Sequence, residues 1–430
     1  MSTAVDDNLT KATSATDKPD AGKFTSVNHS MDESAPEYAP IKSGVRVPVI
    51  VLGGEANALS VARDLGSMGV KVYAIGEAAS CVKSSRYCQW VVPPKTGSSV
   101  KSWTDFLLGN DSEYLRGAVL LACSDSGLQV LIPNRRELSK KYRLDISNTQ
   151  AQNEMLDKLT TYKHAIKSNT PVPKFWEVST KEQVAAVKDQ LVYPLLVKPR
   201  LSHLFEAKFG RKHLTAENYE QVLNAFSAAT DAQMDMLLME LIPGDDDQLC
   251  SYFTYLDEQG QPMWHFTKRV IRRFPAGMGG ACYHVTDWIP EIIDQSMRLF
   301  AQVGLRGLAN VEYKRDHRDG QYKLIECNAR FTASNCLVSA AGFSLARYVY
   351  CRLVNLPLPP MKEYKKGLRL WDPIRDFWAY RERKKLGQLT FGKWLVSIMH
   401  FQTSAYFRWT DPMPTIQRFL KPLTKKFKRG

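Results

Sequence analysis

After a polar N-terminal segment, the chain shows short apolar runs separated by a glycine pair and an amphipathic helix pattern. The stretch VPVIVLGGEANALSVARDLGSMGVKVYAIG, from Val47, contains a strand, the pair Gly53-Gly54, a helix that ends near Gly69, and a second apolar strand. This order is typical of a βαβ unit in a doubly wound parallel sheet. A further strand, GAVLLACSD, ends at Ser124-Asp125, where such sheets place ligand contacts. The pattern G-x-G-x-x-G is absent, so NAD binding has little support.

The pattern changes from Asn153, where NEMLDKLTTYKHAIKSN predicts one helix that ends before Pro171. Strand patterns follow in YPLLVKP and MLLMELIPGDDD. A third region, WHFTKRVIRRFPAGMGGAC, joins basic residues to a glycine-rich turn, and another helix is expected near residues 290 to 303. The chain is therefore predicted to be an α/β protein with an N-terminal doubly wound domain and a two-lobed α+β domain. The predicted divisions are a disordered polar arm (1–43), the N-terminal domain (44–150), a small lobe (151–235), a large lobe (236–360) and a basic helical extension (361–430).

The stretch NVEYKRDHRDGQYKLIECNARF, residues 310–331, predicts a hairpin, because two alternating runs flank Asp319-Gly320, a pair that favours tight turns. With a period of two, the first run turns Glu312 away from its neighbours Val311 and Tyr313. The same period places four side chains on one face of the second run: Leu324, Glu326, Asn328 and Arg330.

The repulsion between the two carboxylates on this hairpin face must be offset by solvent or by a bound cation. Two carboxylates about 5 Å apart repel by roughly 3 kcal/mol at an effective dielectric constant near 20. Solvent on an exposed face is one answer. A shared divalent cation is the other, since Glu312, Glu326 and Asn328 supply three or more of the oxygen ligands that Mg²⁺ prefers.

Composition and charge indicate the compartment and the partners that suit this chain. The chain has 430 residues, 44% of them hydrophobic, and no apolar run long enough to span a membrane. Its eight cysteines form no C-x-x-C pair, and its start has no secretory h-region, so a reducing cytoplasm is expected. Residues 361–430 hold 17 Lys and Arg against 5 Asp and Glu, which is 12 of the net +14 charges. The body is therefore nearly neutral, and no nucleic-acid partner is expected.

The order of these pieces resembles the ATP-grasp superfamily, and within it the carboxylate-amine ligase group. The resemblance covers about residues 47 to 350 and is strongest in YPLLVKP, LMELIPGDDD and NVEYKRDHRDGQYKLIECNAR. It implies that the N-terminal domain is a pre-ATP-grasp domain and that the two lobes form the ATP-grasp domain. It also implies ATP as cofactor with Mg²⁺, or alternatively Mn²⁺.

The resemblance further implies roles for individual residues. Lys158 and Lys198 would be point charges on the ATP phosphates. Either Asp246 or Asp247 would accept from the ribose hydroxyls, unless these aspartates belong to a solvated loop. Adenine would meet the Glu240 carbonyl and the Ile242 N–H, and the metal would meet Glu312, Glu326 and Asn328.

Two catalytic arginines are also implied. Arg330 would stabilise the transferring phosphoryl group or the acyl phosphate. Arg272, with Arg273, is a candidate for the substrate carboxylate or the γ-phosphate. The family's glycine-rich lid is replaced by RLSHLFEAKFGRKHL, in which Lys208, Arg211 and Lys212 would cover the phosphates by charge.

The implied reaction has two steps and acts on a small-molecule carboxylate and a small-molecule amine. The carboxylate attacks the γ-phosphorus of ATP to give an acyl phosphate, and the amine then displaces phosphate. A biotin-type carboxylase is one alternative, although the chain lacks a Met-Lys-Met segment. A basic binding protein on a membrane surface is the other, since the tail interleaves aromatic residues with cations. We expect the tail to dock on the body, and peripheral membrane contact stays open.

Overall fold

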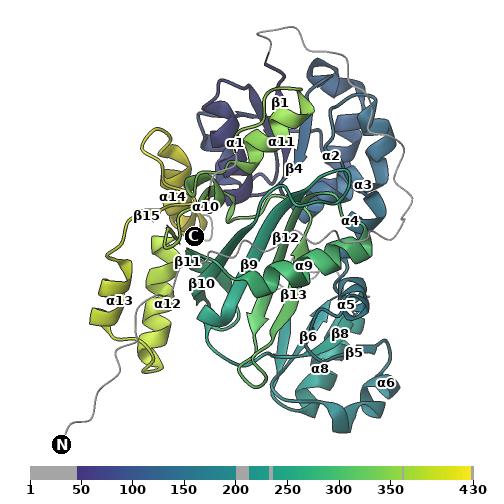
Figure 1. Ribbon diagram of the computed structural model, residues 1–430, viewed down its shortest axis with the longest axis vertical. Helices are drawn as coiled ribbons and strands as arrows, with labels where there is room; N and C mark the ends of the chain where they lie inside the picture. The colour runs from purple at the N-terminus through teal and green to yellow at the C-terminus, as the bar shows by residue number, and fades with distance from the viewer. Residues whose placement is uncertain (1–45, 200–212, 232–235, 361–362, 428–430) are drawn as a thin grey trace, which may run out of the picture.

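The computed structural model describes residues 46–199, 213–231, 236–360 and 363–427. The predicted arm and the cationic segment with Lys208, Arg211 and Lys212 lie outside the described residues. Three sheets follow one another along the chain, and Figure 1 shows them stacked along the long axis of the molecule.

The first sheet confirms the doubly wound prediction. Its strands are parallel in the order β3-β2-β1-β4, and alternate residues of β1 pack on opposite sides. Val49 and Val51 join the core that covers α1, whereas Ile50 and Leu52 join the core that covers α2 and α3. Strands buried on both faces read as continuous apolar runs. The elements are β1 (Val49–Leu52), α1 (Ala56–Gly66), β2 (Val72–Ile75), β3 (Gln89–Trp90), α2 (Ser99–Leu108), β4 (Val119–Ala122) and α3 (Asp125–Ser139).

The helix expected from Asn153 is two helices, which corrects that prediction. α4 (Thr149–Leu156) begins earlier, and α5 (Lys158–Lys167) begins after Asp157. The Asp157 carboxylate caps the new helix by accepting from the Leu159 and Thr160 N–H groups at 2.9 and 3.4 Å. The break places Lys158 in the first turn of α5, where a positive charge is unfavourable for the helix itself.

A small antiparallel sheet of order β5-β8-β6-β7 follows, with α6 and α8 packed on one face. Lys198 lies near the end of its strand β6. The elements are β5 (Phe175–Val178), α6 (Lys181–Ala186), β6 (Leu195–Pro199), β7 (Leu214–Ala216), α8 (Tyr219–Thr230) and β8 (Met236–Glu240).

The third sheet has seven strands in the order β13-β12-β9-β10-β11-β14-β15. α9 lies across one face of it (Figure 1), and its apolar side, from Ile292 to Val303, joins the core under β9, β12 and β13. The elements are β9 (Leu249–Leu256), β10 (Phe266–Phe274), β11 (Gly280–Asp287), α9 (Pro290–Val303), β12 (Gly307–Arg315), β13 (Tyr322–Asn328), α10 (Asn335–Ala340), α11 (Leu345–Leu353), β14 (Arg369–Trp371) and β15 (Gln402–Thr403).

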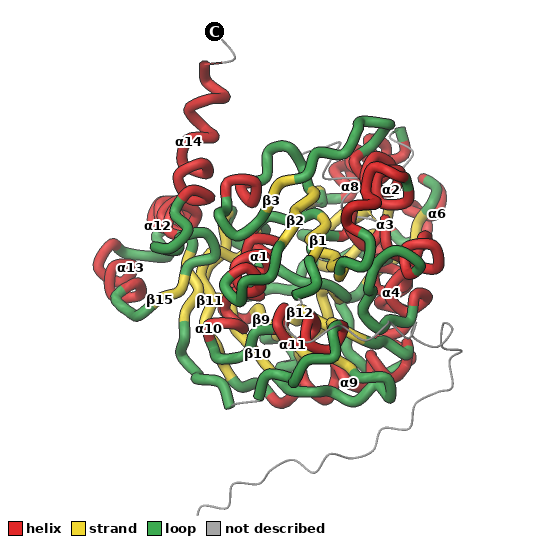
Figure 2. The backbone as a smooth tube through the Cα atoms, turned by 90° about the horizontal axis from the view of Figure 1, so that it is seen from above, coloured by secondary structure: helices red, strands yellow, loops and turns green. Residues whose placement is uncertain are grey.

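The C-terminal extension is docked on the body, as we expected, but it is not purely helical. β14 and β15 add two strands to the large sheet, which corrects the predicted helical extension. α12 (Pro373–Lys385), α13 (Phe391–Ile398) and α14 (Met413–Phe427) complete it. Figure 2 shows α14 projecting away from the body. No helix in the described part of the chain is long and apolar enough to cross a membrane.

Candidate active site

The β12–β13 hairpin brings two carboxylates side by side on one face of the large sheet. Glu312 and Glu326 are direct partners in the strand register and both are half-buried. Asn328 Nδ2 donates to Glu326 Oε1 at 3.2 Å. The shared facing predicted for Glu312 and Glu326 is confirmed.

The same prediction is wrong for Leu324. The register shifts between Glu312 and Tyr313, so that Leu324 pairs with Tyr313. A shift of this kind moves the following side chains to the other face. Leu324 is accordingly fully buried in the apolar core.

A lysine that the sequence did not single out faces the same space. Glu312 pairs with Ser251 of β9, and Ser251 pairs with Lys268 of β10, so the row Glu326, Glu312, Ser251, Lys268 lies on one sheet face. Lys268 is 3% exposed, and its Nζ lies 3.3 Å from His284 Nδ1. Burial lowers the pKa of Lys268, and the nearby Glu312 carboxylate partly offsets this. The stretch WHFTKRVIRRF contains four Lys and Arg residues, and the sequence alone does not show which of them faces Glu312. The strand register shows that it is Lys268.

Arg330 lies where the hairpin meets the first sheet. Its Nε donates to Asp125 Oδ1 at 2.5 Å, directly beyond β4. Burial alone would lower the pKa of Arg330, but the Asp125 and Glu326 carboxylates raise it, so the guanidinium stays charged. Gly53 borders this junction, and a Cβ there would lie 1.9 Å from Ser124 Oγ. The carboxyl edge of the first sheet therefore adjoins the hairpin face.

The two predicted phosphate lysines come from elements that are tied to the hairpin. Lys198 is 7% exposed, and its Nζ lies 3.7 Å from Met239 Sδ of β8. Tyr162 of α5, the helix that Lys158 opens, donates to the Ile325 carbonyl at 2.8 Å. The small sheet, α5 and β13 thus form one connected framework.

The segment after β8 is held by a buried lysine that sequence reasoning also missed. Lys314 Nζ donates to the carbonyls of Ile242 and Gly244 at 2.8 and 2.7 Å. Burial lowers the pKa of Lys314 to about 8. The Glu240 carboxylate is 2% exposed and accepts from Arg318 Nη2 at 3.0 Å. The backbone predicted to meet adenine is thereby fixed on both sides, while the Glu240 side chain serves the fold.

Of the two candidate ribose ligands, Asp246 is engaged elsewhere. It is 1% exposed and accepts from Arg273 Nε at 2.9 Å and from Arg383 Nη2 at 2.5 Å. Burial alone would raise the pKa of Asp246, but these arginines hold it below its usual value. Asp247 is exposed, and its Oδ1 accepts from Gln248 Nε2 at 2.9 Å.

The prediction that Arg272 is catalytic is corrected by its surroundings. Its guanidinium makes a two-point pair with Asp376 of α12, at 2.6 and 2.9 Å, and Nη1 donates to Ser397 Oγ at 2.9 Å. Both partners are almost completely buried. Arg272 therefore anchors the C-terminal extension, and Arg273 likewise holds Asp246.

The hairpin places the carboxylates of Glu312 and Glu326 and the amide of Asn328 close together. Within the described ranges, no group of three or more His, Cys, Asp or Glu side chains is arranged to hold a metal ion. Two adjacent half-buried carboxylates with an amide nevertheless suit a hard cation, provided that phosphate oxygens supply further ligands.

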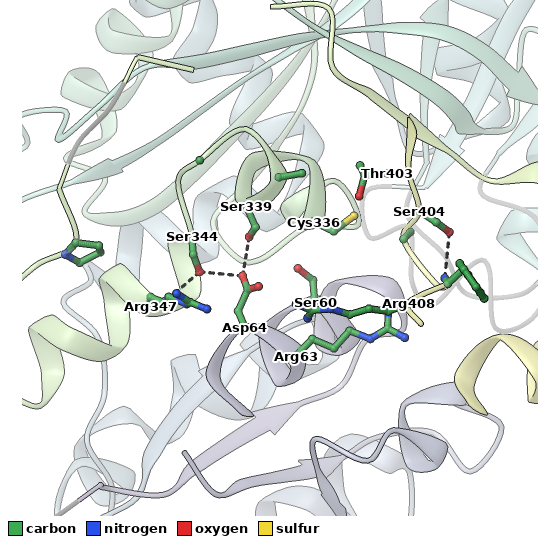
Figure 3. Close-up of a pocket in the computed structure, with 15 residues that line it drawn as sticks. Ser60, Arg63, Asp64, Cys336, Ser339, Ser344, Arg347, Thr403, Ser404 and Arg408 are labelled. Carbon is green, nitrogen blue, oxygen red and sulfur yellow. Dashed lines mark hydrogen bonds between the residues drawn. The ribbon is translucent and has the colours of Figure 1, made fainter. Parts of the chain in front are cut away.

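A separate hollow of about 400 Å³ lies between α1, the α10–α11 turn and residues 403–408 (Figure 3). There Asp64 accepts from the Ser339 and Ser344 hydroxyls at 2.6 and 2.8 Å. Burial raises the pKa of Asp64. None of the predicted nucleotide or metal residues lines this hollow, so it is separate from the hairpin site.

Comparisons with known proteins agree with this geometry. A family described as "Carbamoyl-phosphate synthase L chain, ATP binding domain" matches residues 286–353, which include the hairpin. D-aspartate ligase of Enterococcus faecium is 26% identical over 367 residues, which cover 79% of this chain and 86% of that protein.

Solved structures give the same fold. Biotin carboxylase of Campylobacter jejuni has a TM-score of 0.58 at 14% identity and covers 75% of this chain and 74% of its own. L-amino acid ligase of Bacillus licheniformis has a TM-score of 0.54 at 15% identity, with coverages of 72% and 75%. The matched family, the similar ligase and the similar fold are all those of ATP-grasp carboxylate-amine ligases, the group that the sequence motifs resemble.

Proposed function

We propose that the chain joins the carboxylate of one small molecule to the amine of another, at least one of them an amino acid, with ATP hydrolysed to ADP and phosphate. The names of two similar proteins, D-aspartate ligase and L-amino acid ligase, support an amino-acid substrate. The observation that carries the proposal is the direct pairing of Glu312 with Glu326 beside Asn328.

The three hairpin residues would hold Mg²⁺, with Mn²⁺ as the alternative. A bound divalent cation would neutralise charge on the β- and γ-phosphates. The same face carries Lys268, which would add a positive charge two strands away from Glu312. The repulsion between Glu312 and Glu326 is thereby offset.

The nucleotide would lie between the small sheet and the large sheet. Lys158 and Lys198 would contact its phosphates, and the backbone from Glu240 to Ile242 would meet adenine. Asp247 is the ribose candidate that we retain, because Asp246 is committed to Arg273 and Arg383.

Arg330 would act on the acyl group. The attacking carboxylate oxygen forms a bond to the γ-phosphorus while the bond to the ADP oxygen breaks. The amine then attacks the carbonyl carbon, and the C–O bond breaks so that phosphate leaves with that oxygen. A charged guanidinium beside this centre stabilises the developing negative charge. Its position against Asp125 and near Gly53 supports a substrate site at the edge of the first sheet.

Release of ADP in the presence of acid and amine pairs tests this function. We expect release to require Mg²⁺ and both substrates, with amino acids among the active ones. Release with bicarbonate and without an amino acid would favour the biotin-carboxylase alternative.

We also propose that the ligase contacts a membrane surface peripherally through its C-terminal extension. The concentration of 12 of the 14 net positive charges in residues 361–430 supports this.

A further inference from the structure

The outer surface of the C-terminal extension is unusually apolar. Of the 22 large apolar side chains that the described residues leave exposed, 14 lie between Phe377 and Leu420. α13 has no buried residue at all. Val396 is 65% exposed, and Phe401 and Trp409 are each 86% exposed. Patches of this kind mark interaction sites.

The acidic groups of this region all point inward. Residues 371–420 contain four acids, and each is bound to the body or to a neighbouring helix. Asp376 pairs with Arg272, and Asp411 pairs with Arg63 at 2.9 Å. Asp372 pairs with Arg418 at 2.5 Å, and Glu382 accepts from the Ala276 N–H at 2.8 Å.

Most of the cations of the same region face outward, since five of the eight Lys and Arg residues in 371–420 are exposed. These five lie among the apolar side chains, and the sequence adds five more after Leu420 without any acid. The exposed five are Arg381, Lys384, Lys385, Lys393 and Arg408. The surface is therefore both apolar and uniformly positive.

The three helices lie on one side of the molecule, at the left of both Figure 1 and Figure 2. Tyr380 of α12 stacks on Trp394 of α13 with ring centroids 4.8 Å apart, which holds these two helices together. α14 exposes Met413, Ile416 and Leu420, a spacing that forms one apolar side of a helix.

We propose that these outer faces of α12, α13 and α14, with residues 399–409, bind an anionic lipid bilayer. Aromatic and aliphatic side chains would enter the interface while the surrounding cations meet lipid headgroups. This rests on the peripheral contact proposed above and identifies its surface and its partner. A second copy of the chain would oppose positive charge with positive charge. A nucleic acid would leave Leu395, Val396 and Met399 without apolar partners.

The inner side of the same extension contacts the segment that carries the proposed ribose ligand. Arg383 of α12 pairs with Asp246, next to the ribose candidate Asp247. Docking on lipid through the outer side would thus leave the active-site contacts intact and orient the ligase on the bilayer.

Sedimentation of the full chain with vesicles tests the proposal, and it needs no ATP. The probes are phosphatidylcholine vesicles with and without phosphatidylglycerol, at low and high salt. We expect binding only to the anionic vesicles and its loss at high salt. The variants Val396→Glu/Phe401→Glu and Lys384→Glu/Lys385→Glu should each weaken binding roughly tenfold or more. Val92→Glu, at a 77% exposed position near the first sheet, is the matched control and should bind normally.

Several results would overturn the proposal. These are equal binding of wild type and both double variants, equal binding to neutral vesicles, or loss of binding in Val92→Glu. Self-association without lipid that Val396→Glu/Phe401→Glu abolishes would assign the surface to a second copy. ADP release, measured in the same preparations without vesicles, should be unchanged in the variants, so that failure of lipid binding is distinct from failure of the ligase assignment.

Discussion

At the scale of single residues, Lys198 is the side chain whose proposed role is tested most directly. It is 7% exposed, and its ammonium group lies beside Met239. Lys198→Met should weaken ATP binding about tenfold to a hundredfold, because a hydrogen bond to a charged group contributes roughly 1.5–3 kcal/mol. Adenosine binding should be unchanged, since the lysine would meet phosphate and not the base. Calorimetry with both ligands checks this, with exposed Lys181→Met of the same lobe as control. Equal losses for the two ligands would make Lys198 structural.

The sequence predicted the shared face of Glu312 and Glu326 because strand parity is a local property. It failed for Leu324, because the register shift depends on the pairing of two strands. It also failed for Arg272, whose partner Asp376 lies 104 residues further along the chain. The choice between Asp246 and Asp247 similarly needed the positions of Arg273 and Arg383.

At the scale of elements, the docking of α12 on β10 depends on the Arg272–Asp376 pair, which also receives the indole N–H groups of Trp371 and Trp394 at 3.0 and 2.9 Å. Asp376→Leu should lower the free energy of unfolding by about 3 kcal/mol or more, because Arg272 is left as a buried unpaired charge. Arg272→Met/Asp376→Leu should recover much of this loss. Urea unfolding measures both.

The surface pair Lys101–Asp105 provides the control for this prediction. Its side chains are 58% and 39% exposed, so Asp105→Leu should change stability little. Equal costs at Asp376 and Asp105 would contradict the anchoring role of Arg272. Among the elements, apolar runs predicted β1, β2 and β4, whereas the break between α4 and α5 depended on the cap at Asp157.

At the scale of the whole molecule, Asp145 lies where the first sheet meets the large one. Its Oδ1 accepts from Tyr255 of β9 at 2.5 Å, and burial raises the pKa of Asp145 to about 6. The Asp145 carboxyl group therefore binds a proton more tightly in the folded state than in the unfolded state. As the pH rises from about 4 to about 6, wild type loses the free energy of unfolding that this proton contributes. Asp145→Asn, which does not titrate, should be more stable than wild type by about 3 kcal/mol at pH 7 and not below pH 4. A difference that is independent of pH, measured by denaturant unfolding, would contradict this.

The hairpin is linked to the first sheet through Arg330 and Asp125, and to α5 through Tyr162, so its proposed metal role depends on the whole molecule. Glu326→Gln or Asn328→Ala should reduce Mg²⁺-dependent ADP release at least a hundredfold, because the first removes the negative charge of a proposed metal ligand and the second removes a proposed ligand altogether. The melting temperature should stay unchanged, since both side chains are only half-buried. Turnover at the wild-type rate in either variant would refute the metal role.

In the proposed reaction, a carboxylate oxygen attacks the γ-phosphorus of ATP before the amine attacks the carbonyl carbon. The direct measurement uses each substrate of an active pair in turn with an ¹⁸O-labelled carboxylate, followed by mass spectrometry of the released phosphate. We expect one labelled substrate to transfer one ¹⁸O atom to each phosphate, in step with ADP release. Phosphate that stays unlabelled with both substrates, while the C–N bond still forms, would contradict an acyl phosphate and with it the proposed roles of the hairpin and Arg330.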